Sequence, residues 1–276
     1  MDNMRMVIGF TGWMDGGEVS SGAIDWLASR LGAELISRVD TTASHLFSFP
    51  GSMEVASLFR PEVKIADGLV EAYYPPENTY RCSREHGVLL FKGHEPNFNW
   101  DAFAERMFAY ARECGVELIV FVGSYSGAVP HTREPRIFCA ASDAELKSDL
   151  ANFGLRPACY EGPASFSTHL LAQARQQGFR MASIVAEIPA YIQGANPKGI
   201  EAVVRKLAAI LGADLGLEDL RPVTDEWEKR IASVLAERAE LAEFVHKLET
   251  DYDAEIFETQ MGDLKDWLQE KGIRVD

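Results

Sequence analysis

Short apolar runs alternate with stretches of helical spacing along the first four-fifths of the chain. Residues 116–122, Val-Glu-Leu-Ile-Val-Phe-Val, are too few for a normal helix and rich in β-branched side chains, which predicts a buried central strand. Further strands are predicted at 6–10, 34–40, 63–65, 69–74, 87–91, 136–140, 157–160 and 183–188. Helices are predicted at 19–31, 101–114, 142–152, 163–177 and 198–211. This order predicts an α/β fold with a mostly parallel sheet and helices on both of its faces.

Local signals refine the boundaries of three of these elements. Asp67-Gly68 predicts a hairpin turn between two of the strands. Ser142 and Glu145 have the spacing of a capping box, which predicts that a helix opens there. Pro163 is suited to the first position of the following helix, because no backbone N–H is required at that position.

The apolar pattern changes beyond Pro222. Apolar residues recur there at alternating spacings of three and four, and Arg238 is the one exception. The seam consists of Trp227, Ile231, Val234, Leu241, Val245, Leu248 and Tyr252. Leu235 and Phe244 widen this stripe, which favours a helix docked on a domain surface or a helical hairpin; a subunit-joining helix is the alternative. A last short helix is expected around 264–268.

Charge separates the same segment from the rest of the chain. Residues 222–276 hold 15 acidic and 7 basic residues, a net charge of −8, out of −15 for all 276 residues. We therefore expect a core domain at 1–221 and an acidic helical segment at 222–276. The negative total argues against nucleic acids and anionic membranes as partners, because both require a basic surface.

Composition indicates a cytoplasmic protein. No run approaches the ~18 apolar residues of a membrane span, and the charges of Asp2 and Arg5 leave no signal peptide at the N-terminus. None of the cysteines lies within four residues of another, which excludes a zinc ribbon or a thioredoxin-type pair. We expect reduced thiols at all of them, namely Cys82, Cys114, Cys139 and Cys159.

Polar residues gather in the loops that follow the predicted strands. In a parallel sheet these loops would lie at one edge, where open α/β sheets bind ligands. The candidate pocket residues are Trp13, Asp15, His94, Glu95, His131, Arg133, Glu161, Glu187 and Tyr191. They could bind a phosphate or sugar or perform acid–base chemistry, and structural hydrogen bonds are the alternative. Arg133 is the best anion-binding candidate, although an ion pair with a neighbouring carboxylate is equally open.

Specific catalytic motifs are incomplete. Residues 123–127 are spaced like a nucleophile elbow, but Tyr125 stands where the serine should be. His94-Glu95 begins like a zinc-protease helix, but Phe98 replaces the second histidine and Pro96 would break the helix. Neither a metal nor a cofactor is predicted.

Several dispersed motifs, in order over roughly residues 5–212, resemble those of the proteasome assembly chaperone 2 family, and most closely its bacterial branch. They are Gly12-Trp13, Asp15-x-Gly17-Glu18, the Gly22-Ala-Ile-x-x-Leu helix, Gly93-x-Glu-Pro, Trp100-x-x-Phe103, Val129-Pro-His-Thr-Arg133, Tyr160-x-Gly-Pro163 and Glu187-Ile-Pro-x-Tyr191. The resemblance implies a three-layer α/β/α sandwich similar to the purine nucleoside phosphorylase fold, a helical C-terminal segment and an oligomer.

The same resemblance bears on partners. Proteasome-docking members end in a hydrophobic residue, a tyrosine and any residue, whereas this chain has Arg274 and Val275 at the first two of these positions; this disfavours direct docking to a proteasome. We therefore expect a non-enzymatic, chaperone-like or adaptor protein that binds itself or another protein, with its acidic tail helping assembly. The alternative is a binder or enzyme of a nucleoside or phosphorylated ligand, with His131 or Glu187 as the acid–base group and Arg133 holding an anion.

Overall fold

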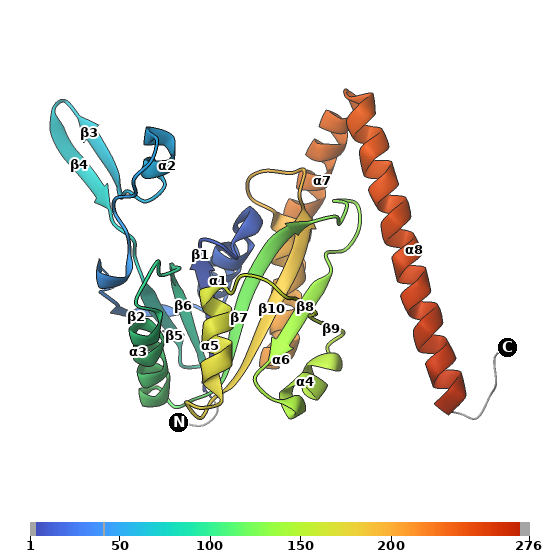
Figure 1. Cartoon of the computed structure of the whole chain (residues 1–276), viewed down its shortest axis with the longest axis horizontal. Helices are drawn as coiled ribbons and strands as arrows, with labels where there is room; N and C mark the ends of the chain where they lie inside the picture. Colours follow the sequence, from blue (N-terminus) through green and yellow to red (C-terminus); the bar gives the residue numbers. More distant parts are fainter. Residues whose placement is uncertain (1–3, 41, 271–276) are drawn as a thin grey trace.

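An eight-stranded sheet forms the centre of the molecule, with the strand order β2-β5-β6-β1-β7-β10-β8-β9 (Figure 1). The computed structural model describes residues 4–40 and 42–270. The strands are β1 (Met4–Thr11), β2 (Glu34–Arg38), β5 (Thr79–Ser83), β6 (Val88–His94), β7 (Val116–Gly127), β8 (Ile137–Ala141), β9 (Arg156–Pro157) and β10 (Arg180–Pro189). The neighbours β6, β1, β7 and β10 are all parallel, so the predicted mostly parallel sheet is confirmed.

Helices cover both faces of this sheet and complete the expected α/β/α sandwich. They are α1 (Val19–Arg30), α3 (Trp100–Glu113), α4 (Ala144–Ala151), α5 (Phe166–Ala174) and α6 (Pro197–Leu211), with short 3-10 turns η1 (Gly16–Glu18), η2 (Thr42–Ser44) and η3 (Leu217–Asp219). Helices α1, α4 and α6 pack into one hydrophobic core, and α3 and α5 pack into a second core. Strand β1 contributes side chains to both cores, because Val7 belongs to the first core while Met6 and Ile8 belong to the second.

Strand β7 is longer than the sequence predicts. Its apolar run ends at Val122, but the strand continues to Gly127, which pairs with Pro189 of β10. The segment 123–127 is therefore a paired strand and not a nucleophile elbow. Backbone pairing with β10 prevails here over the low strand propensity of glycine and serine.

Two predicted helix starts are wrong by a few residues. The N-cap of α4 is Asp143, whose carboxylate accepts a hydrogen bond from the N–H of Leu146 at 2.8 Å. The hydroxyl of Ser142 instead accepts a hydrogen bond from the N–H of Met181 at 3.0 Å. Helix α5 begins at Phe166 behind the N-cap Ser165, and not at Pro163.

A small projection, which we call the arm (residues 52–74), extends from one end of the molecule (Figure 1). It consists of α2 (Met53–Ser57) and the antiparallel hairpin β3 (Glu62–Ala66) and β4 (Leu69–Tyr74), which form a two-stranded sheet of their own. Asp67 and Gly68 have φ values of 49° and 77°, as a tight hairpin turn of the type I′ class requires. The predicted hairpin is thus confirmed, but it lies outside the central sheet.

The C-terminal segment forms two helices, α7 (Leu220–Ala236) and α8 (Ala239–Glu270). The single exception in the heptad seam, Arg238, lies in the turn between them, so the seam belongs to a helical hairpin. The side chains of Val245 and Tyr252 in α8 are buried, and the hydroxyl of Tyr252 donates a hydrogen bond to the carbonyl of Glu134 at 3.0 Å. The expected short helix at 264–268 is the end of α8, and Arg274 and Val275 lie outside the described residues. Among the helices described, none is long and apolar enough to cross a membrane.

Candidate functional site

Most of the loops that hold the candidate pocket residues follow parallel neighbouring strands. They follow β6, β1, β7 and β10, so their residues lie toward the carboxyl edge of the sheet. The expectation that Glu161 follows a strand of the same direction is wrong. It follows β9, which runs opposite to β10 because β8 is antiparallel to β10 and β9 is parallel to β8. The side chain of Glu161 is exposed.

Glu95 joins three segments at this edge. Its Oε2 accepts a hydrogen bond from the N–H of Trp13 at 2.9 Å, and its Oε1 accepts one from the N–H of Phe166 at 2.8 Å. Both carboxylate oxygens thus hold the loop after β1 and the start of α5 together. The indole of Trp13 itself is 68% exposed.

Asp15 fixes the turn that leads into α1. Its Oδ1 accepts a hydrogen bond from the N–H of Ser21 at 3.0 Å, and partial burial raises the pKa of its carboxyl group. The hydroxyl of Ser124 in β7 donates to the carbonyl of Gly16 at 2.6 Å. The second of these bonds attaches the turn after β1 to the end of β7.

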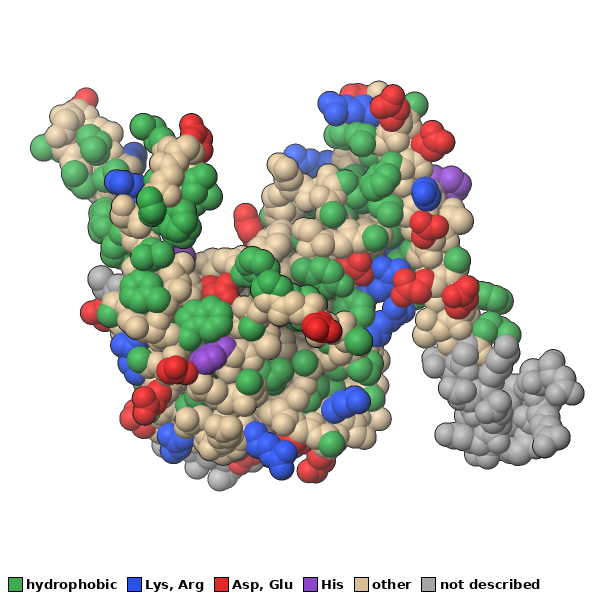
Figure 2. Space-filling model, viewed as in Figure 1, with side chains coloured by type: hydrophobic (Ala, Val, Ile, Leu, Met, Phe, Trp, Pro, Cys, Tyr) green, Lys and Arg blue, Asp and Glu red, His purple; other side chains and the backbone are tan. Residues whose placement is uncertain are grey.

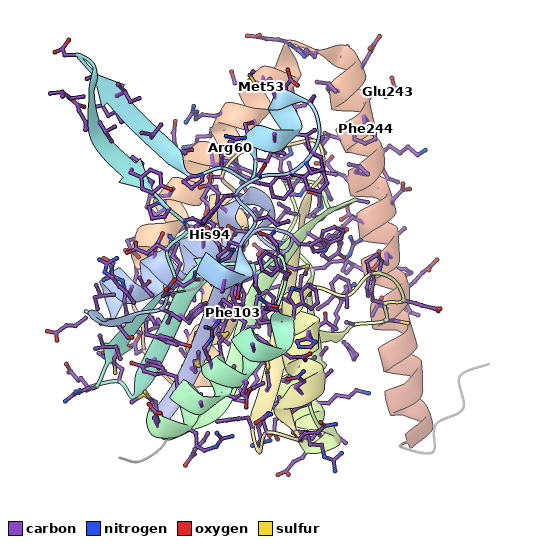
Figure 3. All side chains as sticks on the ribbon, turned by 60° about the vertical axis from the view of Figure 1, so that its left-hand side comes forward. Met53, Arg60, His94, Phe103, Glu243 and Phe244 are labelled. Carbon is purple, nitrogen blue, oxygen red and sulfur yellow. The ribbon has the colours of Figure 1, made fainter. Side chains whose placement is uncertain are left out.

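His94 lies beside a second histidine, His45. The rings of His94 and His45 have centroids 6.2 Å apart and are almost perpendicular; His94 is labelled in Figure 3. Burial lowers the pKa of His45 to about 4, with His94 as a smaller cause. His45 is therefore neutral at pH 7. Within the described part of the chain, no group of three or more His, Cys, Asp or Glu residues could hold a metal ion.

His131 and Tyr191 are brought together by the ends of β7 and β10. The hydroxyl of Tyr191 accepts a hydrogen bond from the N–H of His131 at 2.8 Å and lies 2.7 Å from Nδ1 of the same residue. The ammonium of Lys198 donates to the carbonyl of His131 at 2.8 Å. Burial lowers the pKa of His131, and the positive charge of Lys198 lowers it further.

Arg133 reaches across to helix α8. Its Nε and Nη2 lie 2.8 and 2.7 Å from the two carboxylate oxygens of Asp253, in the bidentate geometry that guanidinium favours. Glu249 lies 3.6 Å from Nη1. Arg133 was predicted either to bind an anion or to form an ion pair with a neighbouring carboxylate. The structure contains the ion pair, and both carboxylates belong to α8.

Glu187 is the most enclosed carboxylate of the group. Its Oε2 lies 2.9 Å from Nη1 of Arg136, and its Oε1 accepts a hydrogen bond from the N–H of Ala128 at 2.8 Å. Arg136 also lies over the ring of Tyr252, 4.4 Å from its centroid, and 2.6 Å from Glu255. Tyr252 belonged to the predicted seam, whereas nothing in the sequence marked Arg136, Asp253 or Glu255 as its neighbours.

The predicted residues thus form separate groups with mainly structural bonds. Trp13, Asp15 and Glu95 hold loops at the ends of β1 and β6. His131, Arg133, Glu187 and Tyr191 lie beneath or beside α7 and α8. A cavity of about 160 Å³ is lined by Tyr80, Phe91 and Phe103 among others, and a more polar one of about 450 Å³ is lined by Arg5, Asp149 and Arg180 among others. None of the predicted pocket residues lines either cavity.

Exposed apolar side chains are concentrated on the arm, a feature that the sequence analysis missed. Large hydrophobic residues of the arm that are 42–84% exposed are Met53, Val55, Leu58, Val63, Ile65, Leu69, Val70, Tyr73 and Tyr74. Figure 2 shows them as green surface on the projection at the upper left. A contiguous patch of exposed apolar side chains usually marks an interaction surface.

A family model described as the PAC2 family matches residues 9–235. No sequence among the curated proteins matches the chain. Two solved structures are 28% identical to it, and the chain covers all of each. A proteasome-assembly chaperone homologue of Mycobacterium tuberculosis superposes with a TM-score of 0.76 over 88% of this chain and 100% of that one. A PAC2 family protein of Streptomyces avermitilis gives 0.75 over the same shares.

A third structure comes from an archaeon. It is a homologue of proteasome-assembly chaperone from Pyrococcus furiosus, 19% identical, with a TM-score of 0.63 over 92% of this chain and 95% of that one. At this identity the likeness concerns the fold alone.

Proposed function

This chain belongs to the PAC2 family, whose model matches residues 9–235, and on that premise we propose that it is a chaperone-like or adaptor protein that self-associates and acts without catalysis. The observation that carries the proposal is the exposed apolar surface of the arm. Burial of apolar area is the main driving force of protein association, and this surface has no cover within the described chain.

The polar groups at the strand ends support the same proposal. Both oxygens of Glu95 and both oxygens of Glu187 accept hydrogen bonds from the protein itself. Arg133 directs two donors to Asp253. A catalytic or ligand-binding group needs free donors or acceptors that point at the substrate, and these groups are already occupied.

The relatives support a protein as the partner. The Mycobacterium tuberculosis structure, with which the chain shares 28% identity, is a proteasome-assembly chaperone homologue. The net charge of −15 disfavours nucleic acids and anionic membranes. We therefore expect a cytoplasmic protein whose partners are other copies of itself or another protein.

The second candidate function is the binding or conversion of a nucleoside or phosphorylated ligand at the strand ends. For this function, Arg133 would have to leave Asp253 to hold the anion, and the ligand would compete with α8 for the guanidinium. No observation favours this step, so self-association is the better supported function.

Native mass spectrometry of the freshly purified full-length chain tests the proposal. We expect an oligomer whose mass is a whole multiple of the 30.6 kDa chain, without an adduct. A bare monomer at micromolar concentration would contradict self-association. A stoichiometric small-molecule adduct would instead support the second candidate, and its mass would indicate the class of ligand.

A further inference from the structure

The cavity of about 160 Å³ lies between α3 and the strands β5 and β6. Helix α3 contributes Phe103, which is labelled in Figure 3, together with Met107 and Tyr110. These three share one face of the helix, because they are spaced by four and three positions. The strands contribute Tyr80 and Phe91, which are opposite each other in the pairing of β5 with β6. The cavity is therefore separate from the candidate residues at the strand ends.

Aromatic rings form most of the wall of this cavity. The ring of Tyr80 has its centroid 4.2 Å from that of Tyr110 and 4.9 Å from that of Phe91. Phe91 and Phe103 meet edge to face at 6.5 Å. The side chains of Tyr80, Phe91 and Phe103 are at most 2% exposed. A dry apolar cavity of about 150 Å³ in another protein holds one benzene molecule, so the space suits a single six-membered aromatic ring.

One cation lines the same cavity. The guanidinium of Arg106 lies over the ring of Phe103, 5.8 Å from its centroid. Arg106 is exposed and marks the side on which the cavity meets solvent. Arg133 and Arg136 form ion pairs, whereas no carboxylate in the described part of the chain pairs with Arg106. Its donors are thus available to a ligand, and their planar arrangement suits a carboxylate.

The hydroxyl of Tyr80 is the second polar group at the cavity. Burial raises the pKa of this phenol, and the positive charge of Arg106 lowers it by a smaller amount, so the hydroxyl keeps its proton and remains a donor. Within residues 4–40 and 42–270 no hydrogen-bond partner of this hydroxyl is found. A buried donor without a partner is unfavourable, and an acceptor atom of a ligand beside Arg106 would satisfy it.

We propose that this cavity binds a small aromatic carboxylate, with the ring enclosed by the aromatic wall and the carboxylate held by Arg106 and Tyr80. An uncharged ring would leave the guanidinium and the phenol unused. A phosphate monoester carries up to about two negative charges opposite the single cation that the described residues place at the cavity, and the excess charge would lie against an apolar wall. Neither the arm nor self-association enters this proposal, which therefore goes beyond the proposed function.

Titration of the purified full-length chain with benzoate provides the test, and benzamide is the neutral compound of nearly the same shape. Calorimetry gives the two dissociation constants, and changes in amide NMR shifts locate the site. We expect saturable binding of benzoate with shift changes centred on α3, β5 and β6. The dissociation constant of benzamide should be roughly tenfold higher or more, because it cannot form the charged pair.

Two variants assign this preference to one guanidinium. Arg106→Gln keeps a long polar side chain at an exposed position, so the variant should fold as the wild type does. It should raise the dissociation constant of benzoate roughly tenfold or more and leave that of benzamide unchanged. Arg112→Gln is the matched control, because Arg112 is an exposed residue of the same helix and lies 5.6 Å over the ring of Phe179. Since Arg112 does not line the cavity, this variant should bind benzoate as the wild type does.

A third variant tests the phenol. Tyr80→Phe keeps the buried ring and removes the hydroxyl, and it should raise the dissociation constant of benzoate about threefold or more. An unchanged constant would overturn the assignment of Tyr80 as a donor to the ligand. Thermal unfolding of the three variants, measured without ligand, shows whether each retains the fold.

The outcomes are distinct from those that test self-association. Benzoate binding that Arg106→Gln weakens and Arg112→Gln leaves intact supports the aromatic carboxylate site. Absence of saturable binding up to about 10 mM benzoate overturns it, and so does equal affinity for benzoate and benzamide. Equal losses in Arg106→Gln and Arg112→Gln also overturn it, because the effect would then be a general attraction of anions to α3. Because benzoate is added to the purified chain and the mass of the oligomer is not a readout, either proposal can fail alone.

Discussion

Arg136 and Glu187 form a buried ion pair in which Nη1 and Oε2 are 2.9 Å apart and both side chains are 8% exposed. The other oxygen of Glu187 accepts a hydrogen bond from Ala128 N–H. A side chain at Gly127 would collide with the same carboxylate, so glycine is required where β7 ends. The pair fixes the ends of β7 and β10 relative to each other, and it is also the point where Tyr252 and Glu255 attach α8.

Replacing Arg136 with alanine should destabilise the fold strongly. Glu187 would remain buried without its cation, and the loss of one partner of a buried pair costs about 3–5 kcal/mol. Chemical denaturation measures this loss. The control is Arg180→Ala, which removes an ion pair with Asp149 in which both side chains are about half exposed and should cost at most ~1 kcal/mol. Equal losses in the two variants would mean that solvent reaches the Arg136–Glu187 pair.

Replacing Arg133 with alanine should loosen α8 on the core domain. The bidentate bond to Asp253 disappears, and we expect faster hydrogen exchange in the backbone of α8 around residues 245–255. Asp253→Asn should have a similar effect. Asp251→Asn, which changes a neighbouring exposed carboxylate, should leave the exchange unchanged. If the exchange of α8 in Arg133→Ala equals that of the wild type, other contacts hold the helix.

The apolar pattern predicts the fold well where burial alone decides the element. Strands β1 and β6 and helices α1, α3 and α6 are found close to their predicted positions, because each has a continuous apolar face toward a core. The pattern fails where pairing with the backbone of another strand determines whether a segment forms a strand. Strand β5 was not predicted, since Thr-Tyr-Arg-Cys-Ser has a single large apolar residue, Tyr80, and its pairing with β6 supplies the rest.

The candidate site was less predictable, because its contacts join residues far apart in the chain. Arg133 and Asp253 are 120 positions apart, and no local spacing indicates their pairing. The arm shows a related limit. Its strand β3 alternates polar and apolar residues like a strand with one buried face, and only the structure reveals that this face has no partner within the described chain.

Acid should destabilise the protein through His45. Burial holds the pKa of this histidine at about 4 in the folded chain, below its ordinary value of 6.5. Between these values the unfolded chain binds a proton and the folded chain does not, so the free energy of unfolding is intact above pH 6.5 and falls as the pH drops toward 4. The loss by pH 4 is on the order of 3 kcal/mol.

Denaturation at several pH values in this window would measure the effect in the wild type and in His45→Gln. The variant should lose less stability between pH 6.5 and 4 than the wild type. His246→Gln is the control, because His246 is an exposed residue of α8 and its replacement should keep the slope of the wild type. Parallel curves for the wild type and His45→Gln would show that His45 is protonated in the folded chain as well.

Salt should strengthen self-association if the apolar surface of the arm forms the contact. Each copy carries a net charge of −15, so two copies repel each other at low ionic strength, while the contact itself is largely apolar. Raising NaCl from about 0.01 M to about 1 M shortens the Debye length from roughly 30 Å to 3 Å and removes this repulsion. The dissociation constant of the wild type, followed by sedimentation, should therefore fall as salt rises. An increase in the dissociation constant with salt would instead indicate that oppositely charged groups hold the copies together, and the acidic tail would be the first place to look for them.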